Sequence, residues 1–524
     1  MPDSLTAVLT RLVYVPDGGM VHPGLPVEWV LAVLALMTAM LALSLRPVLT
    51  GQAGSGGEIS LPLHRGVFAW LLHHRWVLVS LRIAMAAVFL LVIAAGLFGT
   101  PVPERNLATV LTWTIWWSAV VISVFFVGTV WCAVCPWDSL AGWLVRRRLW
   151  RRGSRTASLN LRVPRAFRNI WPALWMFIGL TWLELGAGVT VSPYATALLA
   201  LLMVVLATVS LAVYERKAFC RYFCPVGRTL GAYAGMSPLA LRPIEQATCE
   251  QCKTLDCYHG TEDIEPCPTH LVMGSLTQST YCTSCGACVQ SCPHDNVAWR
   301  LRRVGSEIVS AARPHRDEAW FALGLLALTL FHGFTMMPYW EGLMSRLAMA
   351  IGDSGRLLAS FSIGMFTSIL LIVMFYAVTI WLVRRVARRA TEYWRIFAAL
   401  AFINLPLAFA FHLAHNLNHL VREAHGFWSV VANPLGEGTL PLSMHELHLR
   451  HMNPLLPGDV VATLQALLVL FGFWLALRIT RVRVARLYGD GRSAHLAVIP
   501  VWIYILGASL TSLWLLMQPM VMRM

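Results

Sequence analysis

Residues 282–293 carry four closely spaced cysteines and end in a proline. They read Cys282-Thr-Ser-Cys285-Gly-Ala-Cys288-Val-Gln-Ser-Cys292-Pro293. This is the C-x2-C-x2-C-x3-C-P spacing with which bacterial ferredoxins bind iron–sulfur clusters. Three thiolates on one short loop hold a cubane cluster, and the fourth cysteine reaches a neighbouring cluster. The run therefore predicts one part of a two-cluster domain.

A second cysteine run lies upstream and also ends in Cys-Pro. Its members are Cys249, Cys252, Cys257 and Cys267, followed by Pro268. Because the fourth cysteine of each run serves the other cluster, each predicted [4Fe–4S] cluster takes ligands from both runs. One set is Cys249, Cys252, Cys257 and Cys292, and the other is Cys282, Cys285, Cys288 and Cys267. The alternative is a pair of structural zinc sites, but two complete runs ending in Cys-Pro favour iron.

The composition of the whole chain is that of a membrane protein. Of its 524 residues, 57% are hydrophobic and 13% are charged, and the mean hydropathy is +0.63. This excludes an ordinary soluble enzyme and predicts an all-α polytopic membrane protein with one inserted polar domain. The net charge of +15 comes from arginine clusters between apolar segments. Such clusters set membrane orientation, so we expect no nucleic-acid partner.

About ten apolar segments are long enough to cross a bilayer. The predicted transmembrane helices cover residues 27–45, 76–98, 107–131, 170–188, 194–214, 319–337, 361–383, 394–415, 460–479 and 496–520. A two-cluster ferredoxin-like domain (245–318) is inserted between the fifth and the sixth. The other predicted parts are an N-terminal segment with the first helix (1–75), a four-helix membrane core (76–244) and a C-terminal four-helix membrane domain (319–524).

Arginine clusters give the predicted orientation. The main ones lie within residues 146–155, 384–389 and 481–492. Ten spans that begin outside put all of them on one side, which is cytoplasmic by the positive-inside rule. Cysteines that bind iron–sulfur clusters also require a reducing compartment. We therefore expect a bacterial inner-membrane protein with a cytoplasmic ferredoxin domain and both termini in the periplasm. Residues 1–28 lack the pattern of a cleavable signal peptide.

Two further cysteine pairs precede prolines at the inner ends of predicted helices. They are Cys132 and Cys135 before Pro136, and Cys220 and Cys224 before Pro225. The two helical hairpins that carry them form a weak internal repeat, so the four thiols would meet if the hairpins pack side by side. They would then hold a further metal centre or form a redox-active disulfide. The alternative is four buried thiols beside prolines that mark helix ends.

This order of features resembles the membrane polyferredoxins. That family includes the quinol-oxidising subunit of the periplasmic nitrate reductase system and part of the nitrous-oxide reductase accessory flavoprotein. The resemblance covers residues 76–300 and rests on Cys132–Pro136, Cys220-Arg-Tyr-Phe-Cys224-Pro225 and the two ferredoxin runs. The first pair departs by having two intervening residues where the family usually has three, and the first ferredoxin run is lengthened. The family implies electron exchange with the quinone pool, but it leaves residues 319–524 unexplained.

Seven histidines gather in this unexplained part, toward the outer side. They are His332, His412, His415, His419, His445, His448 and His451. His412, His415 and His419 share one helical face, and His332 lies at a depth comparable with His412. Imidazole binds haem iron, copper and zinc, so we predict a b-type haem held by His332 and His412, or else a copper or zinc site. The alternative is interfacial histidines without a ligand. Glu184 is a further candidate, because ionisable groups are rare in membrane helices.

These patterns predict a membrane iron–sulfur protein that passes electrons between the quinone pool and a partner redox protein, expected in the periplasm. Its expected cofactors are two [4Fe–4S] clusters, quinol, and haem or copper on the outer side. Quinol releases two electrons and each cluster carries one, so two linked clusters suit a component of the quinol-dehydrogenase type. The alternative function is an accessory protein that supplies electrons or copper for maturation of a periplasmic metalloenzyme. A transporter is less well supported, since no pair of broken helices is evident.

Overall fold

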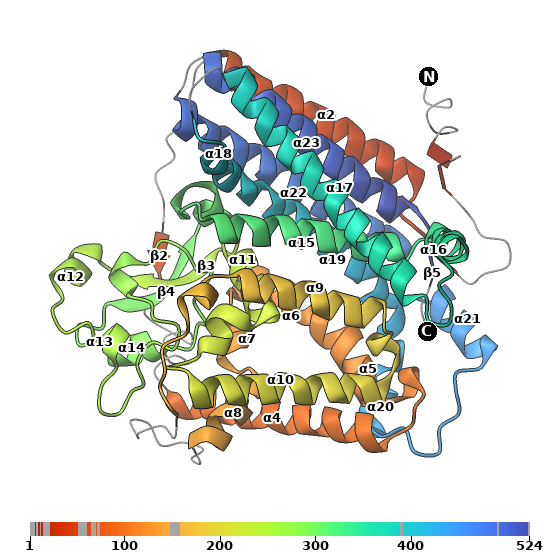
Figure 1. The fold of residues 1–524 in the computed structure, drawn as a ribbon, viewed down its shortest axis with the longest axis horizontal. Helices are drawn as coiled ribbons and strands as arrows, with labels where there is room; N and C mark the ends of the chain where they lie inside the picture. Colours follow the sequence, from red (N-terminus) through yellow and green to blue (C-terminus); the bar gives the residue numbers. More distant parts are fainter. Residues whose placement is uncertain are drawn as a thin grey trace.

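The fold is a bundle of long helices with a small domain of strands and short helices at one end (Figure 1). The computed structural model describes residues 6, 9, 10, 12, 13, 21–50, 60–63, 70, 74–146, 158–387, 391–489 and 492–521. The bundle has two parts that share a continuous apolar core, which extends from Leu25 to Met520. The small domain has a separate core of its own around Leu241 and Trp299.

The first part of the bundle is the membrane core, drawn in the lower half of Figure 1. Its helices are α4 (Arg75–Phe98), α5 (Leu107–Thr109), a π-helical segment η2 (Val110–Trp116), α6 (Trp117–Val127), α7 (Val130–Ala133), α8 (Pro136–Arg146), α9 (Trp171–Leu185), α10 (Pro193–Val213) and α11 (Pro225–Ala234). Proline begins three of these helices, because its fixed φ and missing N–H suit the first helical position. At α10 the Ser192 side chain adds a cap by accepting the Ala195 N–H at 3.2 Å.

The second part of the bundle contains the C-terminal helices together with the first long helix of the chain. Its helices are α2 (Val27–Thr50), α15 (Arg316–Thr335), α16 (Pro338–Ile351), α17 (Leu358–Ala387), α18 (Tyr393–Leu400), α19 (Asn404–Glu423), α20 (Phe427–Ala432), α21 (Met444–Met452), α22 (Gly458–Tyr488) and α23 (Arg492–Met517). Helix α2 packs against α22 and α23. Helix α19 packs against both α15 and α22, and the apolar segment Tyr393–Ala432 that contains it has a hydrophobic stretch that is 94% buried. It is therefore the central helix of this part.

Nine helical segments in the described part of the chain are long and apolar enough to cross a membrane. The segment predicted over residues 170–188 is α9, whose 15 residues make it shorter than the others. Five of the nine segments lie beyond residue 315. The C-terminal domain was described as a four-helix domain, but the five apolar segments predicted within residues 319–524 correspond to these five. The continuous helical stretch Gly458–Tyr488 also ends nine residues beyond its predicted end.

The two ends of the chain meet at the end of the bundle opposite to the small domain (Figure 1). Strand β1 (Val21–His22) pairs antiparallel with β5 (Met520–Val521). Nearby, the Leu25 N–H donates to the Leu516 carbonyl at 2.7 Å. The termini therefore share one end of the molecule, as expected for an even number of crossings. Which membrane side that end faces stays a prediction.

The small domain is built on a three-stranded antiparallel sheet of order β2-β4-β3. Its strands are β2 (Ser60–Pro62), β3 (Leu239–Pro243) and β4 (Val297–Arg302), and its short helices are α12 (Gln246–Gln251), α13 (Asp256–His259) and α14 (Ala287–Ser291). Strands β3 and β4 flank the two cysteine runs and pair with each other, so they close both runs into one unit. Strand β2 comes from the segment between the first two long helices. The sequence had not assigned this segment to the domain.

Several predicted features lie outside the described residues. They are the Gly-rich loop at 51–57, the arginines at positions 147–155 and those at 388 and 389. Helix α21 is described, but the side chains of His448, His451 and Met452 are not. The positive-inside argument thus stays a prediction from the sequence.

Candidate metal centres

The first predicted cysteine set comes together in the small domain. Cys249, Cys252, Cys257 and Cys292 line one cavity of about 30 Å³. Burial raises the pKa of the Cys257 thiol, and the neighbouring thiols of Cys249, Cys292 and Cys252 raise it further. Cys292 thus joins the first run in space, although it belongs to the second run in sequence. The side chains meet as the crossover spacing predicts.

The second set also comes together. Burial raises the pKa of Cys282 to about 11, and the thiols of Cys285 and Cys267 act in the same direction. Burial also raises the pKa of Cys288. The thiols of Cys285, Cys282 and Cys267 raise it further, and so does Cys257 of the first set. The two sets are therefore neighbours, with Cys288 and Cys257 at their contact. Transfer of an electron between them would cross only a short distance.

Matching turns follow the two Cys-Pro dipeptides of this domain. His270 and Asp295 each lie three residues after a cysteine and have positive φ values of 56° and 47°. These turns aim the Leu271 N–H at the Cys267 Sγ and the Asn296 N–H at the Cys292 Sγ, both at 3.3 Å. Main-chain donors of this kind stabilise thiolates and tune the potential of a bound cluster. The two halves of the domain thus repeat the same local geometry.

The donor sets fit cubane clusters better than zinc ions. A zinc ion draws its four thiolates to about 2.3 Å from one point. Among the described residues, no three His, Cys, Asp or Glu side chains converge closely enough to hold a single ion. A cubane needs wider spacing, because each thiolate binds a different iron. Each set would thus hold one [4Fe–4S] cluster, which would supply a one-electron carrier.

The two Cys-Pro pairs of the membrane core also meet. Burial raises the pKa of Cys132 to about 12, with a further contribution from the Cys224 thiol. Burial likewise raises the pKa of Cys135, and the nearby thiols of Cys220 and Cys224 raise it further. We call these four residues (Cys132, Cys135, Cys220 and Cys224) the thiol site. All four thiols are free in the structure.

Helix starts explain why each pair ends in Cys-Pro. Pro136 and Pro225 are the first residues of α8 and α11. Cys224 is the N-cap of α11, and its Sγ accepts the Gly227 N–H at 3.2 Å. Helix N-termini carry partial positive charge and favour thiolates. The thiol site therefore lies where two helix N-termini converge, which suits an anionic or metal-bound sulfur.

Three charged residues surround the thiol site. Asp138 accepts a hydrogen bond from the Cys220 thiol at 3.7 Å and forms an ion pair with Lys217 at 2.5 Å. Arg228 is fully buried, and its charge lowers the pKa of Cys132 and Cys224 against the larger effect of burial. The positive charge of Arg228 also interacts electrostatically with the Glu318 carboxyl. A buried guanidinium is costly without nearby negative charge, and thiolates in the site would supply part of it.

The thiol site borders the second cysteine set of the small domain. The Cys282 thiol contributes to the raised pKa of Cys132. Next to them, the hydroxyls of Thr129 and Ser284 are hydrogen-bonded at 2.8 Å. Arg228 donates to the Thr280 carbonyl at 2.6 Å, two residues before Cys282. The cysteines thus form a series that runs from the thiol site through the second set to the first.

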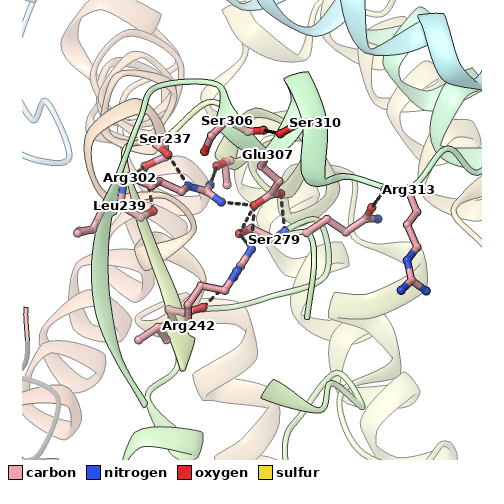
Figure 2. A network of polar contacts seen from close by, with 12 residues as sticks. Ser237, Leu239, Arg242, Ser279, Arg302, Ser306, Glu307, Ser310 and Arg313 are labelled. Atoms are coloured by element: carbon pink, nitrogen blue, oxygen red, sulfur yellow. Dashed lines mark hydrogen bonds and ion pairs between the residues drawn. The ribbon is translucent and has the colours of Figure 1, made fainter. Parts of the chain in front are cut away.

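A buried ionic network fastens the small domain to the bundle (Figure 2). Glu307 is 1% exposed and accepts hydrogen bonds from Arg242, Arg302 and both the N–H and the hydroxyl of Ser279. Burial would raise the pKa of Glu307, but Arg302 and Arg242 outweigh it and hold that pKa below its ordinary value. Ser279 lies three residues before Cys282. The network therefore positions the loop that begins the second set.

The histidines that the sequence singled out divide into two groups. The Trp117 indole N–H donates to His412 Nε2 at 3.0 Å, and Tyr233 Oη lies 3.5 Å from His412 Nδ1. The His415 ring lies 5.2 Å from that of His332 and 5.1 Å from that of His419, between centroids. His445 is exposed on α21. The predicted haem ligands are His332 and His412. In the structure the His332 ring contacts His415 instead, because His412 is held by Trp117 and Tyr233.

Comparisons with known proteins agree with this arrangement. The family model described as "4Fe-4S binding domain" matches residues 109–154 and 196–236, which include the thiol site. YccM of Escherichia coli (strain K12), provisionally named an electron transport protein, is 32% identical over 120 residues, or 22% of this chain and 28% of its own. The ferredoxin-type protein NapH of Haemophilus influenzae is 30% identical over 84 residues, 14% of this chain and 26% of its own. No solved structure matches.

The fold and these matches thus combine helices that are long and apolar enough to cross a membrane with a region similar to a 4Fe-4S binding domain. Over the matched residues the chain is similar to polyferredoxin-type membrane proteins. It spans about a quarter of the length of the curated relatives that it matches.

Some site residues escaped the sequence reasoning. Arg228 and Lys217 read as ordinary basic residues near a membrane surface, and Asp138 as a helix N-terminal acid. One available signal was helical spacing, because Arg228 follows Cys224 by four residues and so faces the same side. Glu307 and Tyr233 gave no comparable signal. Their roles depend on partners distant in the chain.

Proposed function

We propose that the protein carries electrons between the quinone pool and a partner redox protein, through two [4Fe–4S] clusters in the small domain. The clusters would be held by the two cysteine sets in the crossover arrangement. The series of thiols described above carries this proposal. A chain of closely spaced sulfur ligands from the membrane core to the domain surface serves electron transfer better than it serves structural zinc.

The thiol site would hold a third iron–sulfur centre in this proposal. The family description and the match over residues 109–154 and 196–236 support it. The buried Arg228 beside the thiols and the two helix N-termini favour an anionic group there. The third centre would link the interior of the bundle to the second set.

Cysteine variants test the cluster assignment. Anaerobically purified protein should contain about eight irons for two clusters, or about twelve if the thiol site holds a third. Cys252→Ser and Cys285→Ser should each remove one cluster from the EPR spectrum and leave part of the signal of the other. Zinc in place of iron in the wild-type protein would overturn the assignment and the proposed function with it.

The proposed setting is a bacterial inner membrane, with the small domain in the cytoplasm and the termini and partner in the periplasm. The placement of the termini opposite to the small domain supports this topology. A reporter that is active only in the cytoplasm should be silent after Met524 and active near position 152. The reverse pattern would invert the orientation but leave the clusters in place.

A haem or copper centre among the histidines stays a prediction, and with it the alternative role in maturing a periplasmic metalloenzyme. Among the described residues, neither ring nitrogen of the buried His415 has a hydrogen-bond partner, which favours His415 over His412 as a ligand together with His332. Reduced protein should show haem bands that His415→Ala removes, or bind copper that the variant does not. Metal analysis that finds neither haem nor copper would exclude this centre.

A further inference from the structure

A cavity of about 290 Å³ lies between the two parts of the bundle, at the end away from the small domain. Its walls come from η2 and α9 of the membrane core and from α15 and α19 of the C-terminal part. The volume is close to the lower limit of small-molecule sites, roughly 300 Å³. The family match does not extend to α15 and α19. The cavity therefore depends on a part of this chain that the family match does not cover.

The cavity contains more ionisable groups than the interior of a membrane bundle normally allows. Glu184, His419 and Glu423 all line it. His419 Nδ1 lies 2.8 Å from the Glu423 carboxylate, and the Thr114 hydroxyl donates to the same carboxylate at 3.2 Å. Ionisable groups at this depth are costly and mark a functional site. A histidine–carboxylate pair and a second carboxyl form two proton acceptors around one space.

Several of the remaining lining residues are apolar or aromatic, including Trp113, Trp117, Phe177 and Leu328, while Glu104, Asn416 and Arg422 add polar groups. Leu442 and Leu447 also line the cavity, in a segment held to η1 (Pro103–Arg105) by the Arg105–Glu446 ion pair at 3.1 Å. An apolar box with a few polar groups suits a flat ring that carries two exchangeable protons. A metal ion is a poorer occupant, because no three ligating side chains of the described residues converge.

A side-chain path connects the cavity to the thiol site. Trp117 and His412, which line the cavity, are hydrogen-bonded to each other, and His412 contacts the Tyr233 hydroxyl. Tyr233 lies on α11, which begins immediately after Cys224. Tyr233 follows Cys224 by nine positions, which corresponds to roughly 13 Å along the helix axis. Trp117, His412 and the short helix α11 thus connect the cavity to the thiol site.

We propose that this cavity binds the ring of a quinol, and that its residues accept the two quinol protons at the end of the bundle opposite to the small domain. This rests on the proposed function, which supplies the electron acceptors. The two O–H bonds of the quinol break. One proton goes to the His419–Glu423 pair and the other to Glu184. The two electrons leave one at a time by way of His412 and Tyr233, two oxidised iron–sulfur clusters are each reduced by one electron, and quinone remains.

The position of the cavity has a consequence for charge movement. Protons leave at the end that carries the termini, whereas electrons leave through the small domain at the other end. Oxidation of quinol would thus separate charge along the axis of the bundle. The same residues would return protons in the reverse reaction, quinone reduction.

Photo-crosslinking tests the location without depending on electron transfer. An azido-ubiquinone with a short tail is activated on the purified full-length protein, and the labelled peptides are identified by mass spectrometry. Labels should fall in residues 109–117, 177–191 or 412–423, and unlabelled short-chain ubiquinone should compete. Competed labels confined to segments at the small-domain end would overturn the location, as would labelling that no quinone displaces.

Kinetics test the proton acceptors. Clusters reduced with dithionite are mixed with menadione or short-chain ubiquinone, and their reoxidation is followed optically. Glu184→Gln and Glu423→Gln should each slow it on the order of 10²-fold, the usual contribution of a positioned acid or base. Glu437→Gln and His425→Gln are matched controls, since both residues are exposed outside the cavity, and they should react at the wild-type rate.

The two proposals fail in different ways. Absence of cluster EPR signals in the wild-type protein would overturn the proposed function itself. If neither quinone reoxidises the clusters of the wild-type protein, both the quinone part of the proposed function and the cavity assignment are wrong. Normal rates in both carboxyl variants, with intact EPR signals, would overturn the cavity assignment and leave the proposed function standing.

Charge separation is measured in proteoliposomes that contain a trapped pH dye. An external impermeant oxidant accepts electrons only from molecules whose small domain faces outward, and short-chain ubiquinol supplies them. The lumen should acidify, and Glu423→Gln should suppress this by the same factor as the reoxidation rate. Acid appearing outside, or acidification unchanged by the variant, would contradict proton release at the cavity.

Discussion

The two functional ends of this molecule position their groups by different means. At the small domain all eight cysteines lie within residues 249–292, and main-chain N–H groups contact the sulfur atoms. At the cavity the acidic and histidine groups come from helices as far apart in sequence as α9 and α19, and side chains contact side chains. Local turns thus form the first site, and helix packing forms the second. Substitutions should therefore act locally at one end and through packing at the other.

The largest expected effect is loss of a centre at the junction of the two regions. Cys224→Ser removes a thiol site ligand and the sulfur that caps α11. We expect any third iron–sulfur signal to disappear and the two signals of the small domain to persist. Quinone-dependent reoxidation should fall strongly, because the path from Tyr233 passes this site. EPR and rapid mixing measure the two results separately, and loss of all three signals would show that the regions do not fold independently.

Next in size is the buried network that joins the small domain to the bundle. Glu307→Gln leaves Arg242 and Arg302 without their shared anion, and breaking a buried ionic group costs about 3–5 kcal/mol. Hydrogen exchange should show faster opening of residues 276–302. Glu262→Gln, at an exposed position, is the matched control. Unchanged exchange would mean that the network contributes nothing to docking.

The same carboxylate gives a pH dependence whose sign is fixed. Because the pKa of Glu307 is lower in the folded protein than in the unfolded chain, its ionised form stabilises the fold above the unfolded value of about 4.3. That stabilisation is lost as the pH falls through the lower folded value. Acid should therefore loosen the small domain in the wild type. The Glu307→Gln variant should lack this part of the pH dependence in the same exchange experiment.

A smaller effect is expected at the packing of α11 on the ferredoxin loop. A Cβ atom on Gly231 would lie 2.0 Å from the Thr280 carbonyl oxygen. Gly231→Ala should cost about 1–3 kcal/mol through overpacking, with a change in the EPR line shape of the second cluster. A Cβ atom on Gly142 of α8 would meet no atom of the described residues within 4 Å, so Gly142→Ala is the control. Equal behaviour of the two variants would contradict close docking.

The smallest effect concerns the cover of the cavity. The Arg105–Glu446 ion pair has side chains that are 20% and 46% exposed, and such surface pairs contribute little to stability. Glu446→Gln should leave thermal stability nearly unchanged while access of quinone to the cavity increases. Stability is read from thermal unfolding and access from the rate of crosslinking. A large loss of stability would show that the segment supports the fold as well as covering the cavity.

Much of the small domain and the membrane architecture could be predicted from residues alone. The crossover of Cys267 and Cys292 follows from the spacing of the two runs, and the structure gathers both sets accordingly. Long apolar segments predicted most of the crossing helices. Strand β2 was missed, because three residues that complete a distant sheet edge carry no pattern of their own.

The sequence by itself determined the features that short-range chemistry controls. Cysteine spacing fixes which thiolates can share a cluster, and the length of an apolar segment fixes whether a helix can cross a bilayer. Tertiary structure alone decided which histidines touch, where Arg228 is buried and which carboxyls share a cavity. The physical reason is that helical periodicity places a side chain on a face, but the partner of that face depends on how the other helices pack. His412 shows this, because its helical face could be predicted, whereas its contacts with Trp117 and Tyr233 depend on how α19 packs against the membrane core.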